Sequence, residues 1–128
     1  MSALFWKRVY KPASREDGYR ILVDRLWPRG LKKERAALDN WSKLISPSTA
    51  LRQAYHQGVL DYDSFAADYE QELEHNPYFE EFTTLIKDHL KNGNVTLVYS
   101  SKEPKLSHIP TLQAHIEKES GIKSVYSD

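Results

Sequence analysis

The pattern of apolar and polar residues predicts three strands before any other element. Each is a short apolar or aromatic stretch bounded by proline, glycine or charged residues, and they lie at residues 4–10, 19–26 and 94–100. The second contains an unbroken apolar run at residues 21–23, which is typical of a strand buried on both faces. Because Pro28 cannot donate to a ladder and Gly30 allows a turn, we expect this strand to end at about Leu26 or Trp27.

Apolar residues at helical spacing predict four helices, bounded by capping and breaking residues, at residues 46–58, 61–76, 79–93 and 107–121. Ser46 is the expected N-cap of the first helix, with Pro47 at its first position. Asp61 or Asp63 caps the second helix, and Ser107 caps the last. We assign the regularly spaced aromatic residues of these helices to the core rather than to a cofactor pocket.

Two segments allow alternative interpretations. Residues 38–45 predict either a further strand or a short helix with Leu38, Trp41 and Ile45 on one face. Residues 120–128 predict either an edge strand or a loose tail.

Together these elements predict a single α/β domain over residues 1–128, with a mostly parallel sheet of about four strands and helices packed on it. The long helical segment between the strands at 19–26 and 94–100 permits them to be parallel neighbours. Their carboxyl ends would then share one edge of the sheet, which is where open α/β sheets bind ligands.

Charge adds a constraint on partners. Eighteen basic and eighteen acidic side chains give a net charge of zero, which argues against a general nucleic-acid or membrane binder. The distribution is uneven: residues 7–35 hold ten Lys or Arg against four acids, whereas residues 61–81 hold eight acids and no Lys or Arg. This asymmetry fits a basic patch near the predicted strand ends, and it fits ordinary solvated faces equally well.

Cysteine is absent, which excludes disulfides, thiolate nucleophiles and cysteine-ligated metals. The apolar start at residues 3–6 is too short for a signal sequence, and no later run approaches the length of a membrane span. We therefore expect a cytoplasmic protein that does not contact membranes.

Candidate chemistry gathers at the two predicted strand ends, which carry Asp24, Arg25, Trp27 and Arg29 on one side and Ser100, Ser101, Lys102 and His108 on the other. Guanidinium groups beside a helix N-terminus can bind phosphate or carboxylate oxygens. We name Arg25, Trp27, Arg29, Ser100, Ser101 and Lys102 as candidate ligand-binding residues. Asp24 and His108 are the candidate acid and base.

Each candidate also has a purely structural interpretation. Asp24 can be a salt-bridged strand end, Trp27 a lid over the core, and His108 a donor to a backbone carbonyl. The sequence lacks the Gly-x-Ser-x-Gly, Walker, Rossmann and zinc patterns, and its other histidines show no ligand spacing. We therefore expect neither a metal nor a cofactor.

Several strings resemble the bacterial family called domain of unknown function 488, in its YeaO-like branch; they lie at residues 7–10, 17–30, 39–41, 47–52 and 96–100. The most specific is Val-Asp-Arg-Leu-Trp-Pro-Arg-Gly, and the match runs from about residue 7 to 115. The resemblance implies an α/β fold and draws attention to His108, which corresponds to the histidine of the family's usual Asn-His-Ala. Here the flanking residues are Ser107 and Ile109, so the family's amide is replaced by a hydroxyl.

Three functions remain open. The one we favour is a small enzyme that acts on an anionic metabolite or nucleotide at the carboxyl ends of the central strands. The alternative is a non-catalytic anion-binding or protein-interaction module. A nucleic-acid-associated protein ranks third, because it needs a continuous basic stripe. If Asp24, Arg29 and His108 converge on one open pocket, the enzyme gains support; if they are separately paired and covered, the binding module does.

Overall fold

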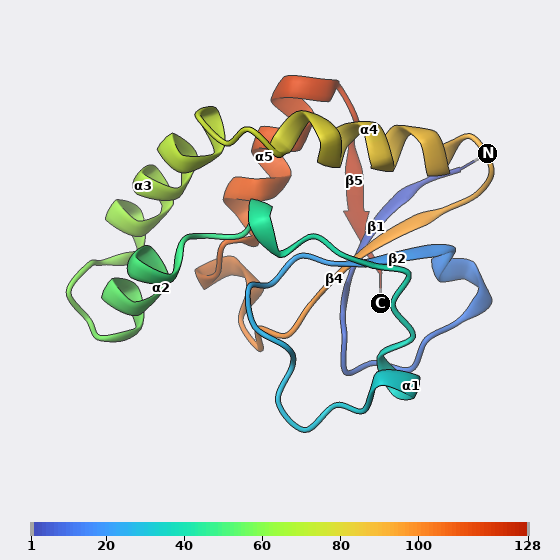
Figure 1. The fold of residues 1–128 in the computed structure, drawn as a ribbon, viewed down its shortest axis with the longest axis horizontal. Helices are drawn as coiled ribbons and strands as arrows, with labels where there is room; N and C mark the ends of the chain where they lie inside the picture. The colour runs from blue at the N-terminus through green and yellow to red at the C-terminus, as the bar shows by residue number, and fades with distance from the viewer. Residues whose placement is uncertain (1, 128) are drawn as a thin grey trace.

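The computed structural model describes residues 2–127 and contains, within them, a five-stranded parallel sheet in the order β3-β2-β4-β1-β5 (Figure 1). Its strands are β1 (Leu4–Arg8), β2 (Tyr19–Leu22), β3 (Asn40–Trp41), β4 (Val95–Tyr99) and β5 (Ser124–Tyr126). The α/β class and the parallel pairing of β2 with β4 are therefore confirmed. The additional strand is β5, which pairs with β1 as an edge strand.

Helices cover both faces of this sheet, and their bounds are α1 (Lys33–Ala36), α2 (Thr49–His56), α3 (Tyr62–Glu74), α4 (Phe79–Leu90) and α5 (Ile109–Ser120). Three short 3-10 helices lie at Arg15–Asp17, Lys43–Ile45 and Pro104–Leu106. Figure 1 shows α3, α4 and α5 on one side of the sheet and α1 on the other. Among the described residues, no helix is long and apolar enough to cross a membrane.

The central strand β4 shows how the two faces are filled. All five of its residues are buried. Val95, Leu97 and Tyr99 belong to the main core under the larger helices, whereas Val98 belongs to a smaller cluster with residues such as Ala36 of α1. Because successive side chains of a strand point to opposite faces, a strand covered on both sides is mainly apolar. The buried hydroxyl of Thr96 is satisfied by donating to the Asp17 carbonyl at 2.7 Å.

Strand β2 ends at Leu22, four residues earlier than the predicted end at Leu26. One further ladder bond runs from the Val23 amide to the Val98 carbonyl at 3.1 Å. At the next residue the Asp24 side chain, rather than its backbone, accepts the Ser100 amide at 2.8 Å. The carboxylate therefore takes the place of a ladder acceptor, and the backbone is released into the loop that carries the candidate residues.

The strand interpretation of residues 38–45 is right for Asn40–Trp41, which form β3. The alternative helix is wrong, because only the 3-10 turn Lys43–Ile45 follows and Leu38 and Ile45 pack in different clusters. The predicted cap of the next helix is wrong: α2 begins at Thr49, and Ser48 rather than Ser46 accepts the Leu51 amide, at 3.2 Å. The Glu72 carboxylate of α3 holds Ser48 in place by accepting from its amide and its hydroxyl, at 2.8 and 2.6 Å. The contact with Glu72, which is distant in sequence, therefore makes Ser48 rather than Ser46 the N-cap of α2.

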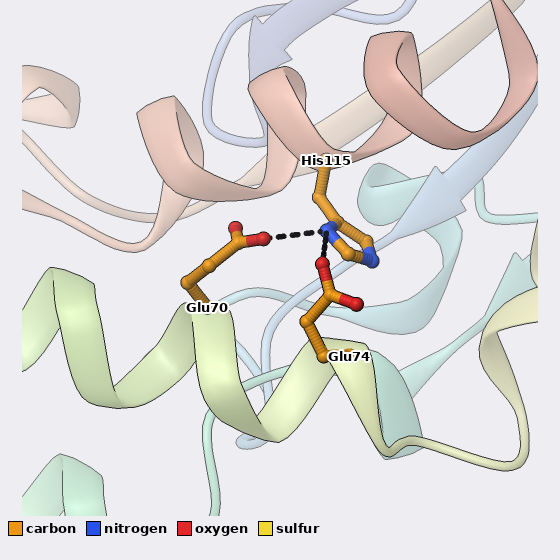
Figure 2. Close-up of side chains that lie close together, drawn as sticks. All are labelled: Glu70, Glu74 and His115. Atoms are coloured by element: carbon orange, nitrogen blue, oxygen red, sulfur yellow. Dashed lines mark hydrogen bonds and ion pairs between the residues drawn. The ribbon is translucent and has the colours of Figure 1, made fainter.

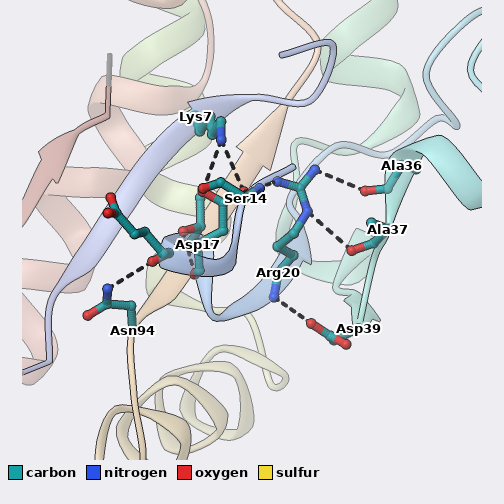
Figure 3. Close-up of polar contacts among 10 residues, drawn as sticks. Lys7, Ser14, Asp17, Arg20, Ala36, Ala37, Asp39 and Asn94 are labelled. Atoms are coloured by element: carbon teal, nitrogen blue, oxygen red, sulfur yellow. Dashed lines mark hydrogen bonds and ion pairs between the residues drawn. The ribbon is translucent and has the colours of Figure 1, made fainter. Parts of the chain in front are cut away.

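A buried ionic cluster lies at the amino-terminal end of β2 (Figure 3). Asp17 accepts hydrogen bonds from Lys7 Nζ at 3.0 Å and from Arg20 Nη1 at 2.5 Å, and all three residues are at most 6% exposed. Arg20 also donates to the carbonyls of Ala36 and Ala37, which fixes α1 beneath the sheet. Burial alone would raise the pKa of Asp17, but bonds from Lys7, the Ser14 amide and Arg20 outweigh it and lower the pKa.

We predict that Asp17→Asn destabilises the protein by about 3–5 kcal/mol, because it leaves two buried cations without a counter-charge. Urea unfolding measures this change, with Glu16→Gln as the control, since Glu16 is an exposed acid of the same 3-10 helix.

Above the ordinary pKa of 3.8 the stabilisation by the Asp17 carboxylate is fully present, and it is lost as pH falls through the lower folded-state pKa. The stability difference between parent and variant should therefore be constant above about pH 5 and shrink below it. Equal effects of the two substitutions would contradict a stabilising role for this cluster.

Candidate functional site

A pocket of about 850 Å³ opens at the carboxyl ends of β2 and β4. Its walls come from the ends of β1, β2 and β4, from α2, and from the segment that leads into α5. All eight candidate residues line it, namely Asp24, Arg25, Trp27, Arg29, Ser100, Ser101, Lys102 and His108. The parallel pairing of β2 with β4 brings these two groups together although more than seventy residues separate them in the chain.

Asp24 is held firmly at the floor of this pocket. One oxygen of its carboxylate, Oδ2, accepts from the Ser100 amide at 2.8 Å and from the Ser100 hydroxyl at 2.7 Å. Its backbone carbonyl accepts from Trp41 Nε1 at 2.7 Å. The side chain is only 13% exposed, so Asp24 is positioned mainly by contacts that join β2 to β4.

His108 lies beside Asp24 but is tied to the backbone. Its Nε2 is 2.8 Å from the Val23 carbonyl oxygen and 3.4 Å from Asp24 Oδ1. Because a carbonyl oxygen only accepts, Nε2 must carry a proton and donate it to Val23. The ring also packs edge-on against Tyr69, with the ring centroids 6.0 Å apart. The nitrogen that faces Asp24 is therefore already committed to a structural hydrogen bond.

Basic side chains dominate the pocket, which five cations line: Arg8, Arg25, Arg29, Arg52 and Lys102. Asp24 is the one acidic residue among the lining residues. Within residues 2–127, none of the five cations forms an ion pair with a carboxylate. Positive charge that is not neutralised by the protein attracts an anionic ligand.

Two of these cations are fixed by backbone carbonyls. Arg25 donates from Nε to the Pro47 carbonyl at 2.8 Å and from Nη2 to the Ser46 carbonyl at 3.0 Å. Arg8 donates from Nε to the carbonyls of Ser100 and Ser101, at 3.0 and 3.1 Å. These contacts hold the guanidinium groups in the wall and keep their charge beside the pocket.

The sequence analysis missed two arginines of the pocket, Arg8 and Arg52, and the environment of Arg52 is the more unusual. Arg52 Nε is the one buried side-chain nitrogen or oxygen without a hydrogen-bond partner among residues 2–127. Such a group is costly to bury, by about 1–3 kcal/mol, and usually has a partner. The available signal was the position of Arg52 four residues after Ser48, which places it on the same face of α2 as the helix cap.

Trp27 does not act as the expected lid over the core. It is 37% exposed, packs edge-on against Trp41 of β3 with ring centroids 5.6 Å apart, and donates from Nε1 to the Leu31 carbonyl. The early end of β2 explains the difference, because Trp27 lies in the loop outside the sheet. The neighbouring Pro28, rather than Trp27, is buried.

Comparison with known proteins gives the family. Residues 3–124 match the family described as "Inactive DUF488-N3 subclade". The chain belongs to this family. It is 50% identical to the uncharacterized protein YeaO of Escherichia coli strain K12 over 102 residues, which cover 80% of this chain and 86% of that protein. It is 34% identical to the uncharacterized protein Rv3073c of Mycobacterium tuberculosis strain H37Rv over 105 residues, 82% of this chain and 86% of the relative.

The uncharacterized protein Mb3100c of Mycobacterium bovis shows the same 34% identity over 105 residues, with the same coverage. No solved structure matches the chain significantly. The resemblance to the DUF488 family is thus confirmed, and the match extends beyond both of its predicted ends.

Ser107, which stands where the resemblance described above predicts asparagine, forms hydrogen bonds with the backbone. Ser107 Oγ accepts from the Ile109 amide at 3.1 Å and donates to the Pro104 carbonyl at 2.6 Å. The hydroxyl therefore caps the start of α5, although His108 is the residue directly before that helix. One partner, Pro104, begins the 3-10 helix before His108, and the other, Ile109, is the first residue of α5.

We predict that Trp27→Ala lowers the free energy of unfolding by only about 1–2 kcal/mol, because the side chain is partly exposed and contacts one neighbouring ring. Trp6→Ala is the matched comparison, since Trp6 is fully buried and its truncation should cost roughly 3–5 kcal/mol. Chemical denaturation of both variants measures the two values. Equal losses would mean that Trp27 does belong to the core.

Proposed function

We propose that this protein is a non-catalytic binding protein that holds a small phosphate- or carboxylate-bearing ligand in the pocket at the ends of β2 and β4. The observation that carries the proposal is the unpartnered, buried Nε of Arg52 in the wall of that pocket. This nitrogen has no exposed surface while the pocket is empty, so the Arg52 side chain must turn toward the pocket before a ligand oxygen can accept from it. The bond then removes the cost of leaving the nitrogen unpaired. Guanidinium groups bind phosphate and carboxylate oxygens with matched geometry, so the ligand class follows from the donor.

The charge balance of the pocket supports the same ligand. Five cations against a single carboxylate favour an anion, and Asp24 is already satisfied by Ser100 and close to His108. Arg29 and Lys102 are exposed and lie at the pocket, so both are available to a bound anion.

The positions of Asp24, Arg29 and His108 support an enzyme in one respect and a binding protein in another. Asp24, Arg29 and His108 do line one pocket, which favours an enzyme. Asp24 and His108 are nevertheless bonded to Ser100 and to the Val23 carbonyl, which favours binding without chemistry. The word "Inactive" in the description of the family adds weight to binding.

Anion binding is tested by a thermal-shift screen of nucleotides, sugar phosphates, small carboxylates and inorganic anions at constant ionic strength. We expect stabilisation by one compound class, with bare phosphate binding at about millimolar strength. Arg52→Gln and Arg29→Ala should each weaken binding of the best compound at least about tenfold in calorimetric titration, because each removes a charge-assisted hydrogen bond. Arg35→Ala removes the same charge from exposed α1, away from the pocket-lining residues, and should bind like the parent. Identical binding by all four proteins, or none in the parent, would refute the proposal.

The second candidate function is an enzyme, favoured by the 3.4 Å approach of His108 Nε2 to Asp24 Oδ1 inside the pocket. The two candidates differ in the fate of the ligand. We predict that a compound found in the screen is recovered unchanged after prolonged incubation, as followed by phosphorus NMR or chromatography. Turnover by the parent that is lost in His108→Gln would instead establish the enzyme, and this variant retains a donor for the Val23 carbonyl.

A further inference from the structure

A second polar cluster lies away from the pocket, between α3 and α5 (Figure 2). Glu70 and Glu74 are four residues apart on α3 and therefore share one helix face, which points toward His115 of α5. His115 Nδ1 is 3.0 Å from Glu70 Oε1 and 3.9 Å from Glu74 Oε1. Two carboxylate oxygens of α3 and one imidazole nitrogen of α5 therefore lie close together.

His115 is an unusual residue for its position. It is only 2% exposed and lies next to Ile116, on the side of α5 that otherwise supplies apolar core residues. The Phe79 ring packs against it at about a right angle, with centroids 4.6 Å apart. The imidazole is therefore held in one orientation, with Nδ1 directed at the two carboxylates (Figure 2).

The spacing of these three atoms suits a metal ion. All three lie within 4.8 Å of one another. Two ligands bound at about 2.0–2.1 Å in a tetrahedral zinc site lie about 3.3 Å apart, and the two distances from His115 Nδ1, 3.0 and 3.9 Å, bracket that value. Small rotations of two partly exposed glutamates would complete the geometry.

Lys118, one turn beyond His115, shows that the cluster already holds a cation. Its Nζ is 2.6 Å from Glu74 Oε1 and 3.9 Å from Glu70 Oε1. The Lys118 side chain is 60% exposed and flexible, so it can withdraw into solvent. It would then compete with a metal ion without blocking it permanently.

We propose that Glu70, Glu74 and His115 form a binding site for a divalent first-row transition-metal ion such as Zn²⁺. Imidazole nitrogen and carboxylate oxygen are ligands that Zn²⁺ accepts, and three protein ligands leave a fourth position for water. The bound ion joins α3 to α5, two of the helices that cover the core on this side, and therefore stabilises the folded chain. The site is independent of the anion pocket and of the proposed function.

The experiment is a Zn²⁺ titration of the full chain by calorimetry, with melting temperature as a second readout and Mg²⁺ at equal ionic strength as the comparison ion. We expect saturable binding of one Zn²⁺ per chain, a higher melting temperature, and no matching response to Mg²⁺. Glu70→Gln and Glu74→Gln should each weaken Zn²⁺ binding at least tenfold. Both replace partly exposed carboxylates with groups of the same shape, so the variants should fold.

Two further variants make the result decisive. Glu117→Gln removes an exposed carboxylate of α5 outside the cluster, and it should bind Zn²⁺ like the parent. Lys118→Met removes the competing ammonium group and should bind Zn²⁺ more tightly than the parent. Equal affinity in Glu70→Gln, Glu74→Gln and Glu117→Gln would overturn the site. Binding only in Lys118→Met, or in none of the proteins, would also overturn it, because Lys118 would then be the natural cation of this cluster.

Discussion

The close approach of Gly18 to Asn94 sets the arrangement on which the rest of the sheet depends. A Cβ atom at Gly18 would lie 1.9 Å from the Asn94 carbonyl oxygen, and the φ angle of Gly18 is +66°. Only glycine fits both the space and the backbone conformation. The contact places Tyr19 so that its amide donates to the same Asn94 oxygen at 2.9 Å, which is a backbone hydrogen bond from the start of β2 to the residue directly before β4.

From that starting point the register continues to the pocket. Tyr19 pairs with Val95 and Leu22 with Val98, and Asp24 therefore arrives beside Ser100. A shift by one residue would exchange the faces to which Ile21 and Leu22 point, and it would separate Asp24 from the Ser100 amide. The geometry of the candidate site is thus determined at the opposite end of the strand from the site itself.

The sequence predicted most of the fold because burial leaves a local signature. The β-branched and mainly apolar β4, the Asp61 cap and the break at residues 76–77 can all be recognised without knowing their neighbours. The predicted end of β2 was too late because the Asp24 side chain accepts the Ser100 amide in place of a backbone carbonyl. Strand propensities of single residues do not reveal such a contact. Trp27 was misplaced for the same reason, since its surroundings depend on where that strand ends.

Some residues of the candidate site could be named from the sequence, and others depended on tertiary packing. Those at strand ends could be named in advance, because parallel neighbours bring their carboxyl ends together. For Arg52 the available signal was only its spacing from Ser48, because the burial of its Nε without a partner arises from the packing of α2 against segments distant in sequence. His115 was set aside for lack of ligand spacing, because its two carboxylate neighbours lie on another helix, more than forty residues earlier.

The cations of the pocket differ in what they can contribute to binding. Arg8 and Arg25 already donate hydrogen bonds to backbone carbonyls, which hold both side chains in place. They therefore contribute mainly positive charge to binding rather than new hydrogen bonds. Arg52 retains an unsatisfied buried donor, whose pairing recovers a desolvation cost that folding has already incurred. A ligand oxygen placed there gains more than one placed at an exposed lysine, where water must first be displaced. Selectivity in this pocket should therefore depend on reaching Arg52, while the remaining positive charge mainly draws the anion in.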